Sequence, residues 1–222
     1  MIHLSETLAL QTVEDFLTCD ELAQLTKIMD AEHAATGWKP THQADVVPAP
    51  PLAQEILHSA TARALPALRR ALPSVVADAT WDYTELTAGQ EIRAHIDGIA
   101  DPGTPPRRIG RLGVVLADAE DGGDFYIATT SHPAIWSGTT VGEAEGFAPG
   151  TPLTHRLPHV HDHGAVPEWL RDTPRTRWTA DAPAGTGIAY GAQVVHGVLP
   201  VRAGRLRKFV TDLIDTRPPH NG

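Results

Sequence analysis

The feature that most constrains the fold is a change in sequence texture near residue 80. Before it, apolar residues recur at the three- and four-residue spacing of amphipathic helices, over about residues 19–36 and from about Leu52 onwards. After it, short apolar segments rich in β-branched residues alternate with Gly, Pro and Asp. Two helices followed by a run of short strands predict an α+β chain, mainly β, whose N-terminal helices pack on one sheet.

Local signals place the predicted elements more closely. Thr18 and Glu21 have the spacing of a capping box at the start of the first helix. Pro66 is expected to kink or interrupt the second helix, and Pro73 to end it. The predicted strands lie near residues 10–16, 80–87, 91–96, 109–117, 124–129, 186–190, 194–200 and 206–214. Short strands with frequent turn signals favour an antiparallel sandwich or barrel.

The stretch 131–178 does not continue this strand rhythm and contains several prolines. An irregular stretch of this length within a compact domain is usually functional or disordered. The 222 residues are therefore interpreted as one domain. Its parts are a helical support over 1–75 and a β core over 76–222, with 131–178 as an insertion.

Composition excludes several classes of protein. Cys19 is the single cysteine, which excludes a disulfide framework and multi-cysteine metal sites and makes a reducing cytoplasm the default location. The net charge of −9 argues against a nucleic-acid partner. No apolar run approaches the roughly 18 residues of a spanning helix, and the first residues do not have the pattern of a secretory signal. A soluble monomer or homodimer is expected.

Candidate chemistry centres on two histidine-containing segments. His95 and Asp97 are two apart in a predicted strand and so point into the same space. With one more histidine they would form the facial triad that suits iron(II), whereas the simpler alternative is an exposed His–Asp pair. His196 lies in an apolar strand, where an imidazole needs a polar partner. Arg205 and Arg207 share a face of the next strand, and an arginine inside a barrel needs a carboxylate.

These residues carry a resemblance to a known family. His95-x-Asp97, Gly122-Gly123-Asp124-Phe125, and His196-x-Val198-x-Pro200-Val201 followed by Arg205 and Arg207 resemble the iron(II)/2-oxoglutarate-dependent oxygenases, in their prolyl-4-hydroxylase-like branch. The similarity covers roughly residues 10–30, 80–127 and 183–214. It implies a double-stranded β-helix, a jelly-roll or cupin-like barrel with the iron at one mouth.

The resemblance also implies roles for individual residues. His95, Asp97 and His196 match the catalytic metal ligands, and Arg207 or Arg205 matches the residue that holds the distal carboxylate of 2-oxoglutarate. The cofactors implied are iron(II), 2-oxoglutarate and O2, with ascorbate as an additional reductant. The presence of Asp97 favours hydroxylation over halogenation. The chain departs from the family pattern at Glu85, where a tyrosine is common, and in the length of its insertion.

The size of the chain, its arginines and its long insertion favour a small metabolite as the substrate, an amino acid or amino-acid-derived intermediate. It would be hydroxylated at an unactivated C–H bond with release of succinate and CO2. Arg108 and Arg111, at the start of a predicted strand, are candidates to hold an acidic group of this substrate, although a surface pair is the simpler interpretation. Alternatives are a hydroxylase of peptidyl residues, and a cupin-type isomerase or lyase that does not use 2-oxoglutarate. The cupin-type alternative keeps the metal triad but gives Arg205 and Arg207 no role.

The insertion contains further polar and aromatic residues. His155, together with the alternating His159, His161 and His163, could form a second metal site, but a solvated polar loop is favoured. Trp136, Trp169 and Trp178 are expected to form a satellite core rather than a substrate wall.

Overall fold

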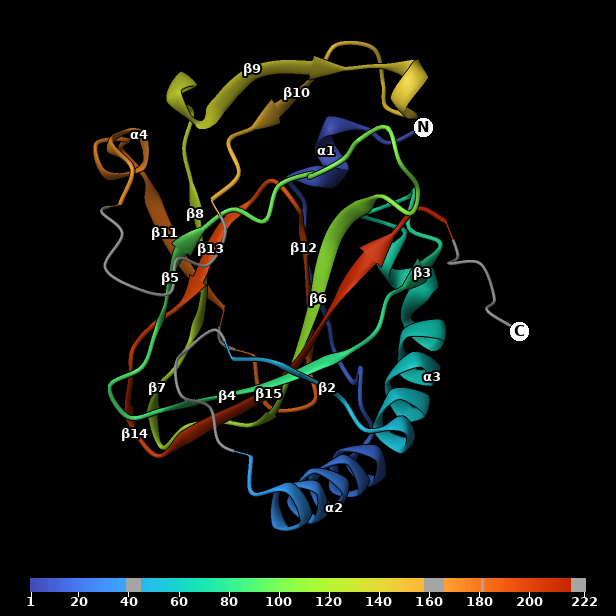
Figure 1. The fold of residues 1–222 in the computed structure, drawn as a ribbon, viewed down its shortest axis with the longest axis vertical. Coiled ribbons are helices and arrows are strands. Elements are labelled where there is room, and N and C mark those ends of the chain that lie inside the picture. Colours follow the sequence, from blue (N-terminus) through green and yellow to red (C-terminus); the bar gives the residue numbers. More distant parts are fainter. Residues whose placement is uncertain (39–44, 158–165, 181, 217–222) are drawn as a thin grey trace.

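The computed structural model describes residues 1–38, 45–157, 166–180 and 182–216, and Figure 1 shows its fold. Its helices are α1 (Leu4–Thr7), α2 (Cys19–Thr36), α3 (Pro51–Leu68) and α4 (Glu168–Arg171), with 3-10 turns at Pro133–Ile135 and Glu143–Glu145. None of the helices in these ranges is both long and apolar enough to span a bilayer.

The predicted capping box is present at the start of α2. The Glu21 backbone N–H donates to the Thr18 hydroxyl over 3.2 Å, and the Thr18 N–H donates to the Glu21 carboxylate over 2.9 Å. The helix ends at Gly37, whose φ of 66° lies in the left-handed region that glycine adopts without a steric penalty. Short-range signals in the sequence therefore fix both ends of this helix.

The second helix, α3, begins with Pro51, where a missing N–H removes no hydrogen bond of the helix. It continues through Pro66 and ends at Leu68, before Pro73. The helix is therefore not interrupted at Pro66, and it ends five residues before Pro73 rather than at it. A proline in the last turn removes one backbone hydrogen bond, and the helix does not extend much beyond it.

The larger of the two main sheets has seven antiparallel strands and carries α2 and α3 on one face (Figure 1). Its order is β1-β12-β6-β15-β4-β2, with β3 paired to β15. The main hydrophobic core lies between this sheet and the helices and includes the fully buried Leu25, Leu57 and Phe209. The strands are β1 (Leu10–Val13), β2 (Val47–Pro48), β3 (Ala77–Asp78), β4 (Asp82–Thr87), β6 (Arg108–Ala117), β12 (Gly187–Gly191) and β15 (Arg205–Ile214).

The smaller main sheet has four antiparallel strands in the order β11-β8-β13-β5. These are β5 (Ile92–His95), β8 (Phe125–Thr129), β11 (Thr176–Ala180) and β13 (Val195–Val198). Side chains from both main sheets line one cavity, so the cavity lies between them. Within the described ranges the strands do not close into a continuous barrel. A mainly β chain with helices on one sheet is confirmed.

Two strand pairs complete the fold, β7 (Asp121–Gly122) with β14 (Val201–Ala203) and β9 (Trp136–Val141) with β10 (Thr151–Thr154). The turn at Gly122 and Gly123 has a structural role. Both residues have positive φ, of 76° and 83°, and a Cβ at Gly122 would overlap the carbonyl oxygen of Pro200. Only glycine fits this turn.

The insertion is more regular than predicted. It contains the β9–β10 hairpin, α4 and most of β11, which extends the smaller sheet by pairing with β8. Strand β11 has no alternation of apolar and polar residues, because nearly all of its side chains are exposed. The period-2 signal by which strands are recognised is therefore missing from it.

Candidate metal centre and adjoining cavity

The three predicted metal ligands come together on the smaller sheet. His95 ends β5 and lies directly opposite His196 of β13 in the antiparallel register. Asp97 follows His95 by two residues. A ligand atom from each of the three side chains lies within 4.8 Å of the other two. In the part of the chain that the structure describes, no other group of His, Cys, Asp or Glu is placed to hold a metal ion.

Backbone carbonyls orient both imidazoles. The Nδ1 atom of His95 lies 2.9 Å from the carbonyl oxygen of Arg93, and that of His196 lies 2.9 Å from the carbonyl oxygen of Val194. Because a carbonyl oxygen only accepts, Nδ1 carries the proton in each neutral ring and Nε2 offers its lone pair. Burial, followed by the neighbouring His196, lowers the pKa of His95 to about 3. This ring is therefore neutral at physiological pH, the form that binds metals.

Asp97 directs one oxygen toward the histidines. Its Oδ2 is buried, lies 3.5 Å from Nε2 of His196, and accepts no hydrogen bond from any described residue. Two imidazole lone pairs and a carboxylate oxygen that face one another in a buried space need a cation between them. The residues therefore fit a divalent metal ion, and two imidazoles with one carboxylate are the facial set typical of non-haem iron(II).

The other oxygen of Asp97 faces two arginines of β6. Its Oδ1 lies 3.6 Å from Arg111 Nη1 and 4.0 Å from Arg108 Nη1. Asp212 of β15 pairs with both, at 3.1 Å from Arg111 Nε and 2.7 Å from Arg108 Nη2. The structure thus brings the two predicted substrate-binding arginines to the predicted metal-binding aspartate, where they form ion pairs with its Oδ1.

A cavity of about 250 Å³ adjoins the histidines. Its walls are mostly apolar and include Ile92 and Phe125 of the smaller sheet and Leu206 and Val210 of β15. Tyr190, Asp82, Thr84, Arg111 and Lys208 supply its polar groups. A small, mostly apolar space with a few polar groups is suited to a ligand of a few carbon atoms.

Lys208 is the cavity residue that the sequence analysis missed. Its side chain is partly buried and forms no ion pair with a described residue. Burial, with a contribution from the neighbouring Arg111, lowers its pKa to about 8. An ammonium group removed from water without a counterion is stabilised by an anionic ligand. The strand pattern gives no signal for Lys208, because β15 has buried residues at both parities.

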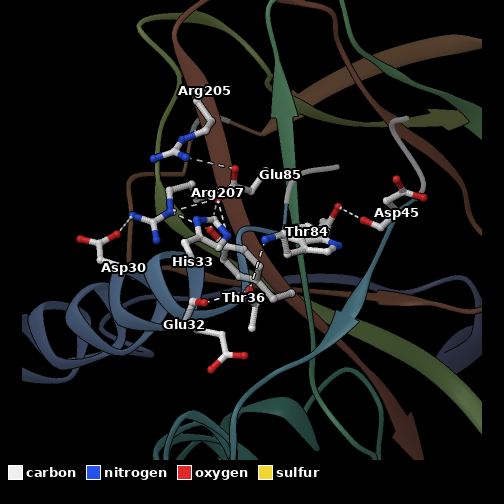
Figure 2. A network of polar contacts seen from close by, with 11 residues as sticks. Asp30, Glu32, His33, Thr36, Asp45, Thr84, Glu85, Arg205 and Arg207 are labelled. Carbon is white, nitrogen blue, oxygen red and sulfur yellow. Dashed lines mark hydrogen bonds and ion pairs between the residues drawn. The ribbon is translucent and has the colours of Figure 1, made fainter. Parts of the chain in front are cut away.

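Arg205 and Arg207, predicted to hold 2-oxoglutarate, lie on the opposite face of β15 from the cavity. Arg207 Nε donates to the Tyr83 hydroxyl over 2.7 Å, and its Nη1 lies 2.9 Å from the Asp30 carboxylate of α2. Arg205 Nη1 lies 3.2 Å from Glu85 Oε2. Figure 2 shows the resulting network between β15, β4 and α2.

This geometry does not support the predicted role of these two arginines. Neighbouring residues of a strand point to opposite faces, so Arg207 and Lys208 cannot both face the cavity. The carboxylates that the arginines need come from α2 and β4 rather than from a cosubstrate. Glu85, compared above with a family tyrosine, belongs to the same network, in which His33 Nε2 lies 3.4 Å from its carboxylate.

The aromatic residues of the insertion behave in two ways. Trp136 and Trp169 pack against a small core around Ile96 and Leu170, as predicted, and His155 stacks on Trp169 with ring centroids 5.0 Å apart. Trp178 does not join this core and is 59% exposed, which corrects the prediction. The other three histidines of the suggested second metal site, His159, His161 and His163, lie outside the described residues.

Comparison with solved structures identifies the fold. A prolyl-4-hydroxylase from Pseudomonas putida is 17% identical, with a TM-score of 0.55, covering 96% of this chain and 95% of that one. AviO1 from Streptomyces viridochromogenes Tue57 is 17% identical, with a TM-score of 0.57 and coverage of 96% and 93%. SnoK, described as a non-heme alpha-ketoglutarate-dependent carbocyclase from nogalamycin biosynthesis, is 12% identical, with a TM-score of 0.57 and coverage of 98% and 86%.

The chain has the fold of the 2-oxoglutarate–iron(II) oxygenases. Prolyl-4-hydroxylases are among its structural neighbours, which agrees with the branch that its motifs resemble. No family model and no curated protein matches the sequence itself. Within this oxygenase fold, the His95–Asp97–His196 group lies where the two sequence motifs predicted it.

Proposed function

We propose that the protein is an iron(II)- and 2-oxoglutarate-dependent dioxygenase that hydroxylates an unactivated C–H bond. The observation that carries this proposal is the convergence of His95, Asp97 and His196 beside a cavity that is also lined by Lys208, a cation that forms no ion pair with a described residue. We also infer that the two facing sheets are those of a double-stranded β-helix, and that residues 1–222 form a single oxygenase domain with an insertion at 131–178.

His95, Asp97 and His196 would hold iron(II), and a site with only three protein ligands would leave the metal accessible to cosubstrate and oxygen. When bound, the metal supplies the oxygen activation that oxidises the C–H bond, with 2-oxoglutarate converted to succinate and CO2. The chain itself positions the metal ligands and shields the cavity from water. Arg111 fixes Asp97 with one oxygen toward the metal, and the apolar walls that include Ile92 and Phe125 exclude water from the cavity.

Lys208 is proposed to take the role that the sequence assigned to Arg205 or Arg207. Its ammonium lies on the larger sheet, across the cavity from the metal ligands on the smaller one. A dicarboxylate bound to the metal through one end can place its other carboxylate on this ammonium. The resulting charge-assisted hydrogen bond is stronger than a neutral one and is further strengthened by the low polarity of the walls.

The substrate is proposed to be a small metabolite, an amino acid or a derivative. Hydroxylation of a peptidyl residue is the alternative within the same chemistry, and the similarity to prolyl hydroxylases supports it. A cupin-type isomerase or lyase would keep the metal ligands but leave Lys208 without a role. Cytoplasmic location, the monomeric or dimeric state, and the use of ascorbate remain predictions.

The experiment that tests the proposal adds iron(II) and then 2-oxoglutarate to metal-free protein without oxygen. A weak visible charge-transfer band is expected from the wild type and not from His196→Ala. Tyr126→Phe, which alters a side chain on the other face of the smaller sheet, serves as a control and should retain the band. If iron binds but no band forms, 2-oxoglutarate is not a ligand and the cupin-type function replaces the proposal.

A further inference from the structure

We propose that the substrate of this centre lies across the metal-bearing face of the smaller sheet, with an anionic group at Arg156 and an apolar part on Trp178. The inference rests on the proposed function and specifies its substrate class. It assigns the substrate as an elongated molecule with a carboxylate or similar anion at one end and an apolar group at the other.

A single row of side chains leads from the metal ligands to Trp178. The register of the smaller sheet places His95 opposite His196, His196 opposite Ile127, and Ile127 opposite Trp178. Directly opposed residues in an antiparallel sheet project from the same face. Trp178 therefore faces the same side as the metal ligands, two strands from His196, or about 10 Å at the usual strand spacing.

Exposure distinguishes Trp178 from the rest of the row. Ile127 beside it is 9% exposed, whereas Trp178 is 59% exposed, and the indole N–H donates to the Thr129 hydroxyl over 3.4 Å. A single exposed apolar side chain is common on protein surfaces. This one, however, continues the metal-bearing face and is the largest side chain in the row. A flat ring there provides contact area for an apolar group of a substrate whose reacting carbon lies at the metal.

Arg156 lies at the other end of the same face. Ile96 and Leu157 form an antiparallel bridge, which adds the chain around residue 157 to the sheet beside β5. Arg156 Nε donates to the backbone carbonyl of Asp97 over 3.3 Å. Its side-chain carbons occupy the space of the missing Cβ at Gly98, where a Cβ would overlap Arg156 Cγ. The arginine therefore packs directly on the turn that carries the metal-binding aspartate.

The positive charge of Arg156 is not paired with any acidic group among the described residues. Arg108 and Arg111, which also approach Asp97, are both paired with Asp212. Arg156 is exposed and forms no ion pair with any residue in the described ranges. The chain as a whole has a net charge of −9. The positive charge of Arg156 beside the metal ligands nevertheless attracts anions locally. A guanidinium group binds a carboxylate through two parallel hydrogen bonds.

The separation of the two contacts sets the size of the substrate. The backbone at Arg156 lies one strand beyond β5, but its side chain reaches over the Asp97–Gly98 turn that follows β5. From β5 to β11 there are three strand spacings, or about 14 Å. A free amino acid is too short to reach both contacts while it also places a carbon at the metal. An acylated amino acid or a short peptide with a free carboxylate is long enough.

The test uses protein loaded with Mn²⁺ and saturated with N-oxalylglycine, an inert analogue of 2-oxoglutarate that fills the cosubstrate site. The probes are 6-phenylhexanoate and its uncharged amide, 6-phenylhexanamide. Paramagnetic relaxation of the probe protons by Mn²⁺ reports binding near the metal. We expect the carboxylate to bind about fivefold more tightly than the amide, the range of a solvent-exposed ion pair.

Variants assign each contact. Arg156→Gln should abolish the preference for the carboxylate, and Trp178→Ala should weaken both probes. Arg171→Gln, which removes an exposed arginine of α4 paired with Asp172, is the matched control and should change neither. Unchanged Mn²⁺ affinity in each variant verifies that the site is folded.

Equal binding of the two probes to the wild type overturns the inference, as does a carboxylate preference that survives in Arg156→Gln. Failure of N-oxalylglycine to bind the Mn²⁺ protein contradicts the proposed function instead. Because the analogue is titrated before the probes, the two failures are distinguished in one experiment.

Discussion

Replacing Lys208 by methionine removes the cavity ammonium while keeping a side chain of similar length. Removal of one partner of a buried ion pair costs about 3–5 kcal/mol. Lys208 is only partly buried, so we expect the lower end of this range. About 3 kcal/mol corresponds to a Kd for 2-oxoglutarate roughly a hundredfold higher than that of the wild type. Iron(II) affinity should not change, because Lys208 is not among the metal ligands.

The lowered pKa of Lys208 adds a signature in pH. The group has a pKa of about 8, below the usual lysine value, so it is charged below pH 8 and loses its proton above it. Affinity for 2-oxoglutarate should therefore be constant below pH 8 and fall above it, by up to about tenfold per pH unit. In Lys208→Met the affinity for 2-oxoglutarate should no longer decrease above pH 8.

The assay is an anaerobic titration of the iron(II) protein with 2-oxoglutarate, followed by the charge-transfer band and repeated over pH. Arg207→Met is the matched control, since it removes the adjacent cation from the opposite face of β15. Loss of the Arg207 guanidinium leaves the Tyr83 hydroxyl and the Asp30 carboxylate without this partner, which should lower the Tm. The affinity for 2-oxoglutarate should stay the same. The reverse outcome, with affinity lost in Arg207→Met and kept in Lys208→Met, would refute the assignment.

Three further changes test the site and its scaffold. Arg111→Gln should weaken metal binding about tenfold, because Asp97 loses a charged contact. The metal Kd is measured by competition with a fluorescent chelator, and an unchanged Kd would show that Arg111 does not position Asp97. Thr18→Ala should lower the free energy of unfolding by about 1 kcal/mol in urea titration, and no change would mean that the cap of α2 is not needed. Gly197→Ala should lower the free energy of unfolding by about 1–3 kcal/mol and also weaken metal binding, because a Cβ there would overlap the Ile92 carbonyl. A fully stable variant would contradict the close packing beside His196.

The elements that the sequence predicts well are those set by neighbours along the chain. Thr18 and Glu21 are three residues apart, and the hydrogen bonds that begin α2 form between them. The positions of His95 and Asp97 are likewise set by the period of a strand. His95 and Asp97 lie beside His196 because β5 pairs with β13, and the residue pattern alone does not determine this pairing. The order of motifs in the resemblance supplied this long-range information.

The pattern of a strand does not distinguish Arg207 from Lys208 as the proposed cosubstrate cation. A strand with one buried face shows by its alternation which residues point inward, but β15 is covered on both faces. Phe209 and Leu213 pack toward the helices, and Leu206 and Val210 line the cavity, so apolar residues occur at both parities. Arg207 and Lys208 are then equivalent candidates until the positions of α2 and its Asp30 carboxylate are known.

The exposed position of Trp178 does not follow from the sequence for a related reason. The expectation that tryptophans of an insertion pack together is correct for Trp136 and Trp169, whose surroundings come from α4 and nearby strands. Trp178 lies in β11, an edge strand whose exposed residues give no periodic signal, and its position is set by pairing with β8. That pairing aligns it with Ile127 and His196, across three strands from distant parts of the sequence. A ligand that lies along the metal-bearing face, as we propose, would cover this ring, which packs into none of the hydrophobic clusters of the described residues.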